Sequence, residues 1–277
     1  MANTAQRLCT DMIDPSITAP LLACRLIALN KNPGVRPIGI GDTARRIIAK
    51  AILTITKTDI QDAAGSVQLC AGQISGIEAA VHAVDSLFQQ ENTEAILLVD
   101  ASNAFNSLNR LTALHNIRHL CPSLATILIN SYRAPTELFV DVDVLYSSEG
   151  TTQGDPLAMP MYALATIPLI KKLHSSLDDV SQIWYADDAS AAGTINKLYQ
   201  WWTQLTSLGP KFGYFANAVK TWLVTKEEHI STAAALFANT GVQVTSEGRP
   251  YLGTAIGSHE FLISHVQEKV GARSCTT

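Results

Sequence analysis

The sequence has few charged residues and no sign of low-complexity structure. Only 16% of its 277 residues are Asp, Glu, Lys or Arg, against a usual ~25%, and 47% are hydrophobic. No internal repeat, low-complexity tract or long linker rich in Pro, Gly or Ser occurs along the chain. The composition excludes a disordered chain and predicts one large or two smaller folded units with a substantial core.

The chain also lacks the usual marks of zinc-binding, disulfide-rich, secreted and membrane proteins. Its five cysteines are widely spaced and form no Cys-x-x-Cys pair: Cys9, Cys24, Cys70, Cys121 and Cys275. This spacing argues against structural zinc and against a disulfide scaffold. The amino terminus has no signal-peptide core, and the apolar stretch 157–170 is too short and too interrupted by proline to span a bilayer. We expect an intracellular protein without membrane association, in either the nucleus or the cytoplasm.

Charge is unevenly distributed along the chain. The net charge is −4, which argues against a uniformly basic nucleic-acid binder. Residues 1–58, however, carry eight basic and three acidic side chains, whereas the remainder carries 12 basic and 21 acidic ones. A basic front part suits contact with phosphates, and an acidic rear part suits the binding of cations.

Two apolar runs end in aspartates. Ala95 to Val99 predicts a buried strand that ends at Asp100, and Gln182 to Tyr185 predicts another that leads to Asp187 and Asp188. An Asp-Asp pair is also typical of a hairpin turn. If the three carboxylates converge, their repulsion favours a hard divalent cation such as Mg²⁺, and two such ions catalyse phosphoryl transfer. The acids therefore indicate nucleotidyl transfer.

The order of motifs around these acids resembles that of reverse transcriptases of non-LTR retrotransposons and group II introns. The motifs cover most of the chain, and their order is more specific than any one of them. They are Arg36-Pro37-Ile38 followed by Arg45 and Lys50; Asp100 with Ala104-Phe105-Asn106; Gln153-Gly154-Asp155-Pro156; Tyr185-Ala186-Asp187-Asp188; Gly213 with Asn217 and Lys220-Thr221; and Leu252-Gly253.

The resemblance implies the cofactor and the residues around it. Asp100 and Asp187 would bind two Mg²⁺ ions, for which Mn²⁺ could substitute. Asp188 would lie beside them, and the Ala101 carbonyl is a further candidate ligand. Lys220 would protonate the leaving pyrophosphate as a general acid, although a plain surface lysine is the alternative.

The resemblance also implies substrate contacts. Arg36 would bind the triphosphate of a dNTP, with Lys31 as a looser assignment. Phe105 would act as a steric gate against the ribose 2′-hydroxyl, although a core aromatic is the alternative. Gln153 and Gly154 would contact the incoming nucleotide and the templating base, and Leu252-Gly253 would form the primer-grip hairpin. The RNA template and the DNA primer are the implied partners, and a partner protein is unknown.

Some basic and aromatic residues have simpler interpretations. We expect Arg45, Arg46 and Lys50 to form a solvated helix face or to contact nucleic-acid backbone, rather than the triphosphate. Trp201 and Trp202 are expected in the core rather than stacked on bases. Met159 stands before Pro160 where the family usually has Ser, a departure in the template-contacting segment.

The expected fold is α+β, with the fingers and palm of a right-hand polymerase. Residues 1–93 would form the fingers, with helical patterning at 45–58 and a helix at 77–90. Residues 94–277 would form the palm, an antiparallel sheet packed on helices, with a strand-like segment near 138–146 and helices at 157–173 and 196–208. No thumb fits after Gly257, which would suit a truncated retroelement reading frame or a partial gene model.

Three other functions remain open. An RNA-dependent RNA polymerase has the same palm but usually has Gly before the paired acids, where this chain has Ala186, and Asp at the position of Phe105. A nucleotide cyclase palm lacks the Gln153-Gly154 element. A non-catalytic relic that binds nucleic acid is the alternative outside the enzymes.

Overall fold

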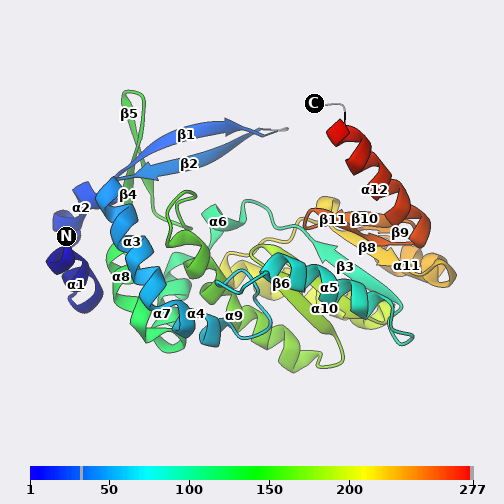
Figure 1. The fold of residues 1–277 in the computed structure, drawn as a ribbon. Coiled ribbons are helices and arrows are strands. Elements are labelled where there is room, and N and C mark those ends of the chain that lie inside the picture. The colour runs from blue at the N-terminus through cyan, green and yellow to red at the C-terminus, as the bar shows by residue number, and fades with distance from the viewer. Residues whose placement is uncertain (32–33, 275–277) are drawn as a thin grey trace. The chain divides into compact units, whose positions relative to one another are not determined.

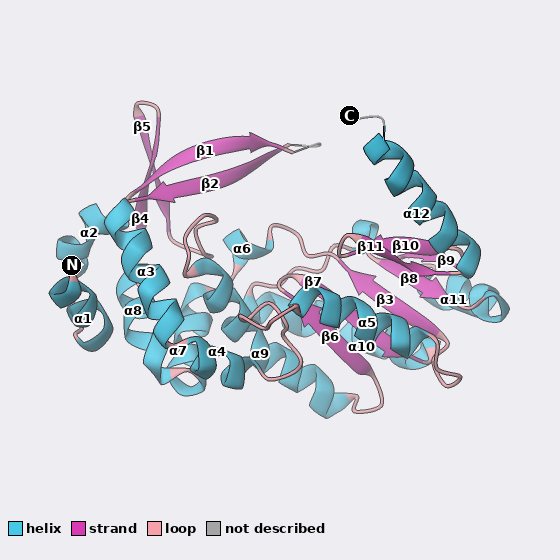
Figure 2. Cartoon of the chain, viewed as in Figure 1, coloured by secondary structure: helices cyan, strands magenta, loops and turns pink. Residues whose placement is uncertain are grey.

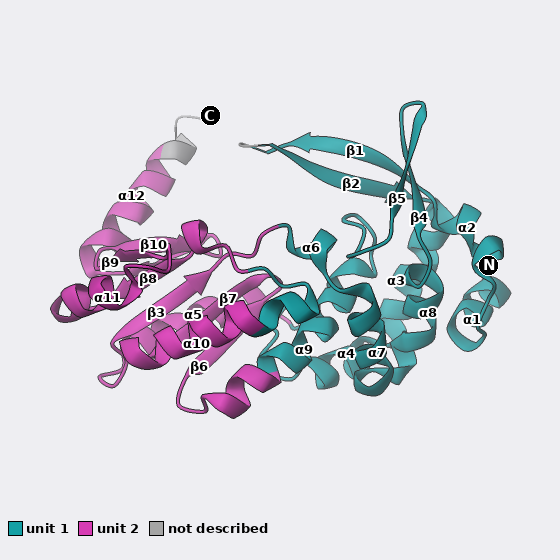
Figure 3. Ribbon diagram, turned by 180° about the vertical axis from the view of Figure 1, so that it is seen from behind, with its two compact units in different colours: residues 1–73, 103–170, 208–215 teal, residues 74–102, 171–207, 216–277 magenta. Residues whose placement is uncertain are grey.

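The computed structural model describes residues 1–31 and 34–274, and Cys275 lies outside this part. The chain divides into two compact units, each assembled from separate stretches of sequence (Figure 3). Unit 1 comprises residues 1–73, 103–170 and 208–215, and unit 2 comprises residues 74–102, 171–207 and 216–277. No helix in the described residues combines the length and the apolar character needed to cross a bilayer.

Unit 1 contains helices and one four-stranded sheet with the strand order β2-β1-β4-β5 (Figures 1 and 2). β1 and β2 are antiparallel, β1 pairs with β4 in parallel, and β4 and β5 form a second hairpin. Its elements are α1 (Ala2–Thr10), α2 (Pro15–Leu22), β1 (Cys24–Asn30), β2 (Val35–Gly41), α3 (Thr43–Ile55), α4 (Lys57–Ala64), α6 (Ala104–Ser107), α7 (Arg110–Leu120), α8 (Pro122–Tyr132), β4 (Thr136–Val140), β5 (Asp143–Ser147) and the 3₁₀ helix η1 (Gly209–Phe212). Helix α9 (Ala158–Ser176) begins in unit 1 and continues into unit 2.

The region around residues 138–146 differs from the sequence expectation. It forms two strands, β4 and β5, joined at Asp141 and Val142, and these strands belong to the sheet of unit 1. Asp141 takes a φ of 51°, a conformation that Asp tolerates better than most residues. The turn contains no Gly or Pro, so the sequence gives little sign of where one strand ends and the next begins.

Unit 2 contains a five-stranded sheet with the strand order β6-β7-β3-β8-β9 and a separate hairpin of β10 and β11. All neighbours in the larger sheet are antiparallel except β8 and β9. The elements are α5 (Gly76–Phe88), β3 (Ala95–Val99), β6 (Ser181–Tyr185), β7 (Asp188–Gly193), α10 (Ile195–Leu208), η2 (Ala218–Lys220), β8 (Trp222–Thr225), η3 (Glu227–His229), α11 (Ile230–Phe237), β9 (Gln243–Thr245), β10 (Gly248–Tyr251), β11 (Thr254–Gly257) and α12 (His259–Ser274).

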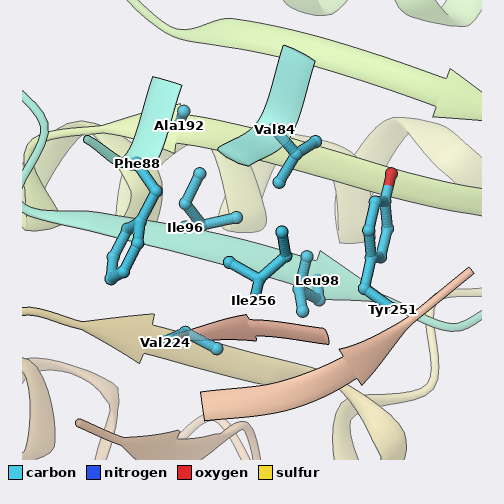
Figure 4. Packing of buried hydrophobic residues seen from close by; sticks show 8 residues of the cluster. All are labelled: Val84, Phe88, Ile96, Leu98, Ala192, Val224, Tyr251 and Ile256. Atoms are coloured by element: carbon cyan, nitrogen blue, oxygen red, sulfur yellow. The ribbon is translucent and has the colours of Figure 1, made fainter. Parts of the chain in front are cut away.

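The central strand β3 is buried along its whole length because both faces of the sheet are covered. On one face, Ile96 and Leu98 pack in a cluster with side chains from α5, β7, β8 and the β10–β11 hairpin (Figure 4). Toward α10, Trp184 of β6 lies near Trp201, with ring centroids 6.3 Å apart. Trp201 and Trp202 are 0% and 5% exposed, which confirms their expected place in the core.

Candidate active site

Two of the aspartates are brought together by the pairing of β3 with β7 in unit 2. The strands are antiparallel, and Val99 pairs with Ala189. The residue after Val99 is Asp100 and the residue before Ala189 is Asp188. Both therefore lie at the same edge of the sheet, the one at which β3 ends and β7 begins. Strand β8 lies on the other side of β3, with Trp222 opposite Leu98, and brings the residues that precede it to this edge.

Asp187 lies in the tight turn between β6 and β7. Tyr185 pairs with Asp188, so Ala186 and Asp187 form the two-residue connection. Ala186 has a φ of 55°, where a side chain is strained. The hairpin expected at the paired acids is confirmed, and it places Asp187 and Asp188 at the edge where β3 ends.

The segment before β8 is fastened to Asp100. The backbone N–H of Asn217 donates to the carbonyl oxygen of Asp100 at 2.8 Å, and Ala101 forms an isolated antiparallel bridge with Ala216. The Nζ atom of Lys220 lies 3.7 Å from Oδ2 of Asp100. Both side chains are about half exposed, at 52% and 42%, so the pair is a solvated contact of small energy.

A pocket of about 270 Å³ opens at this edge of the sheet. Asp100, Asp188 and Lys220 line it, together with residues of β8 and of the β10–β11 hairpin. Trp222, Arg249 and Tyr251 also line the pocket, although no sequence motif assigned them to the site. The guanidinium carbon of Arg249 lies 3.5 Å from the centre of the Trp222 ring, a cation–π contact in the pocket wall. Their only sequence signal is proximity to Lys220 and to Leu252.

Ionisable side chains of this site have shifted pKa values. Burial, then the charges of Asp187 and Asp100, raise the pKa of Asp188 to about 7 from its ordinary 3.8. Tyr251 accepts a hydrogen bond from the Ser190 hydroxyl at 2.8 Å. Burial is the main cause that raises the pKa of Tyr251 to about 12, and the charge of Asp188 adds to it. Tyr251 therefore keeps its proton at neutral pH.

The chemistry of these side chains suits a hard divalent cation. Carboxylate oxygens are the preferred ligands of Mg²⁺, and a cation would relieve the repulsion that, after burial, helps to raise the pKa of Asp188. Within residues 1–31 and 34–274, no group of three or more His, Cys, Asp or Glu side chains is arranged to hold a metal ion.

The expected hairpin at Leu252 and Gly253 is present. These residues form the turn between β10 and β11, closed by the pair Tyr251 and Thr254. Both have positive φ, 46° for Leu252 and 88° for Gly253, as in the type I′ turns that suit two-residue hairpins. Glycine takes one of these two positions without strain, whereas Leu252 takes the other with a side chain. Leu252 also lines the pocket with Asp100 and Asp188.

The residues assigned to nucleotide binding lie in unit 1. Arg36 is exposed on β2 opposite Leu29, and Lys31 is exposed after β1, where its N–H donates to the Gly34 carbonyl at 2.9 Å. Phe105 lies in α6, and its ring stacks on the buried Tyr162, with centroids 4.5 Å apart. This contact fixes the ring while leaving the residue half-buried.

The Gln153-Gly154 segment is attached by its backbone to neighbouring elements of unit 1. The Thr151 N–H donates to the Phe105 carbonyl at 2.6 Å, and the Gly39 N–H of β2 donates to the Gln153 carbonyl at 2.7 Å. A Cβ atom on Gly154 would lie 2.5 Å from the Gly39 carbonyl oxygen, so only glycine fits. Unit 1 thus holds the segments of Arg36, Phe105 and Gln153 in one connected framework.

The expectation for Arg45 is wrong, whereas Arg46 and Lys50 are exposed as expected. The Arg45 side chain is only 7% exposed and forms an ion pair with Asp155, with Nη2 and Oδ2 2.5 Å apart. A guanidinium group buried this far requires an acidic partner, and Asp155 supplies it. Arg45 therefore belongs to the interior of unit 1 and not to a nucleic-acid-binding face.

Solved structures with a similar fold are telomerases. A structure of apo telomerase from Candida tropicalis truncated from its C-terminal domain aligns with a TM-score of 0.63 and 12% identity over 87% of this chain and 54% of that one. Telomerase from Candida albicans, solved in complex with a TWJ fragment of telomeric RNA, aligns with a TM-score of 0.64 and 13% identity over 90% of this chain and 46% of that one. The chain thus spans about half the length of these structures, and at such identity the likeness shows the fold alone. A search of curated proteins found no match.

A family model describes most of the chain. Residues 29–256 match the model "Reverse transcriptase (RNA-dependent DNA polymerase)", a range that begins before Arg36 and ends after Gly253. The range includes the three aspartates Asp100, Asp187 and Asp188, as well as Lys220 and the segment of Gln153. Together with the α+β fold, this match shows that the chain belongs to the reverse transcriptase (RNA-dependent DNA polymerase) family.

Proposed function

We propose that this chain is a reverse transcriptase that synthesises DNA on an RNA template by nucleotidyl transfer. The observation that carries the proposal is the pocket of unit 2, in which Asp100, Asp188 and Lys220 line one edge of the sheet within a chain of this family. The substrates would be an RNA template, a DNA primer and dNTPs. In this proposal residues 1–93 serve as fingers and residues 94–277 as palm.

The carboxylates of Asp100 and Asp187, with Asp188 beside them and the Ala101 carbonyl as a further oxygen, would hold two Mg²⁺ ions. Such ions activate the primer 3′-hydroxyl and stabilise the leaving pyrophosphate when they are bound. Lys220 would donate a proton to that pyrophosphate. Its amino group is held close to the site because its segment is hydrogen-bonded to the Asp100 backbone.

The residues of unit 1 would orient the nucleotide. Arg36, with Lys31, would bind the triphosphate through charge-assisted hydrogen bonds. The ring of Phe105, supported by Tyr162, would exclude a ribose 2′-hydroxyl, and Gln153 and Gly154 would contact the nucleotide and the templating base. Leu252 and Gly253 would grip the primer end. We also propose an origin in a non-LTR retrotransposon or group II intron-like element, on the order of the motifs.

Primer extension tests the proposal. The assay uses a DNA primer on an RNA template with Mg²⁺, and compares dNTPs with NTPs and the native chain with Asp187→Asn. Extension with dNTPs alone, abolished by the substitution, is the expected result. Equal use of NTPs would favour an RNA-dependent RNA polymerase instead. No extension by a folded protein that binds the hybrid would mean a non-catalytic relic.

A further inference from the structure

Three side chains far apart in the sequence form a buried polar cluster in unit 1. Asp155, whose side chain is 2% exposed, accepts hydrogen bonds on Oδ2 from Arg45 of α3 and from the hydroxyl of Tyr132 of α8. Arg45 also donates to the Leu22 carbonyl at 3.4 Å. Burial, reinforced by the charge of Asp155, raises the pKa of Tyr132 well above its ordinary value, so the hydroxyl keeps its proton.

This cluster lies directly beside the segment proposed to contact the nucleotide. Asp155 follows Gln153 and Gly154 in the chain, and its Oδ1 accepts the Leu157 N–H at 3.1 Å just before α9 begins. On the other side, the Gln153 carbonyl accepts the Gly39 N–H. Gly39 is itself confined, because a Cβ atom there would lie 2.3 Å from Cγ2 of Thr152. The segment 152–155 is thus held at one end by β2 and at the other by the cluster.

We infer that Asp155 is a positioning residue: held by Arg45 and Tyr132, it keeps Gln153 and Gly154 against β2, so that the segment of Arg36 and the segment of Gln153 form one rigid nucleotide-binding surface. This inference rests on the proposed function for the nature of the ligand. Nothing in the proposed chemistry requires Asp155 to touch the substrate.

A purely stabilising role explains the cluster less well. Buried ion pairs stabilise a fold weakly, because desolvation offsets much of their attraction, but they constrain geometry strongly. The Nε atom of Arg45 is buried and forms no hydrogen bond with the described residues. The side chains of Arg45 and Tyr132 both donate to the same oxygen of Asp155, Oδ2.

Amide hydrogen exchange at Gly39, measured residue by residue, tests the positioning directly and needs no catalysis. Asp155→Asn removes a charge-assisted acceptor, which should lower the protection of the Gly39 amide by roughly 10- to 100-fold. Tyr132→Phe should lower it less, and the double variant should be no worse than Asp155→Asn alone, because Tyr132 acts through Asp155.

Asn130→Ala provides the matched control. Asn130 is also a buried residue of α8, but it binds the N-terminal segment, donating to the Leu8 and Asp11 carbonyls and accepting the Ile13 N–H. It should destabilise unit 1 without changing exchange at Gly39. If Asp155→Asn leaves Gly39 protected, or if Asn130→Ala exposes it equally, the positioning role is refuted.

Steady-state primer extension then tests the purpose of this positioning. Asp155→Asn should raise KM for dNTP by about 10- to 100-fold while the affinity for primer–template stays as in the native chain. A change in exchange at Gly39 with no change in KM would refute the link to nucleotide binding. A native chain that extends no primer would refute the proposed function, whereas the exchange experiment would still decide whether Asp155 holds the segment.

Discussion

Replacing Asp188 with Asn should stabilise the protein in the absence of divalent metal. The stabilisation should grow as the pH rises from 4 to 7. The folded-state pKa of Asp188 is raised to about 7, because the group is mostly buried and faces the charges of Asp187 and Asp100. Between pH 4 and 7 the folded chain therefore binds more protons at this site than the unfolded chain does. As a result, the free energy of unfolding falls as the pH rises through this window, and above pH 7 this group no longer changes it. Asn cannot ionise, and the substituted chain lacks this fall.

The magnitude follows from the difference between the two pKa values. A separation from 3.8 to about 7 corresponds to roughly 4 kcal/mol of unfolding free energy, since each pKa unit is worth about 1.4 kcal/mol. In a chain of this size that is on the order of 10 °C in Tm. The difference in Tm between Asp188→Asn and the native protein should therefore be small at pH 4 and reach about this amount at pH 8.

The assay is thermal unfolding in EDTA at several pH values, followed by circular dichroism. Asp178→Asn serves as the control, because Asp178 is an exposed acid in a loop of the same unit. Its difference from the native protein should not vary with pH. Adding Mg²⁺ at pH 8 should raise the Tm of the native chain and narrow its gap to Asp188→Asn. A difference in Tm between Asp188→Asn and the native protein that is equal at pH 4 and pH 8 would refute the reasoning.

Two further substitutions test other parts of the candidate site. Phe105→Ala should increase the use of NTPs relative to dNTPs by roughly 10- to 200-fold, measured as kcat/KM for single-nucleotide addition, because it opens the space beside Tyr162; an unchanged ratio would exclude a gate at this position. Tyr251→Phe should cost about 1–3 kcal/mol of unfolding free energy by removing the buried partner of Ser190, and Ser190→Ala in the same chain should recover most of it; strictly additive losses would contradict a shared hydrogen bond.

The helices and strands around the acids could be predicted because their apolar runs are continuous and end at polar residues. Strand β3 has the predicted bounds, and helices α5, α9 and α10 begin and end within three residues of expectation. The meeting of Asp100 with Asp188 was also predictable in outline, since antiparallel neighbours bring the end of one strand to the start of the next. The strands of unit 1 were harder, because β1 is largely exposed and carries no clear alternation of buried and exposed residues.

Arg45 shows both how far a sequence can be interpreted and where it stops. In α3 the buried residues are Arg45, Ile48, Ala49 and Ile52, which follow the spacing i, i+3, i+4, i+7 of a buried helix face. The pattern thus indicates that Arg45 lies on the buried face of α3, whereas its neighbour Arg46 lies on the exposed face. A buried guanidinium demands an acid, but the helix pattern does not say which one. Asp155 lies 110 residues away, in the loop before α9, and only the folded structure identifies it as the partner. Long-range pairing of buried charges is thus the part of this site that local sequence patterns could not supply.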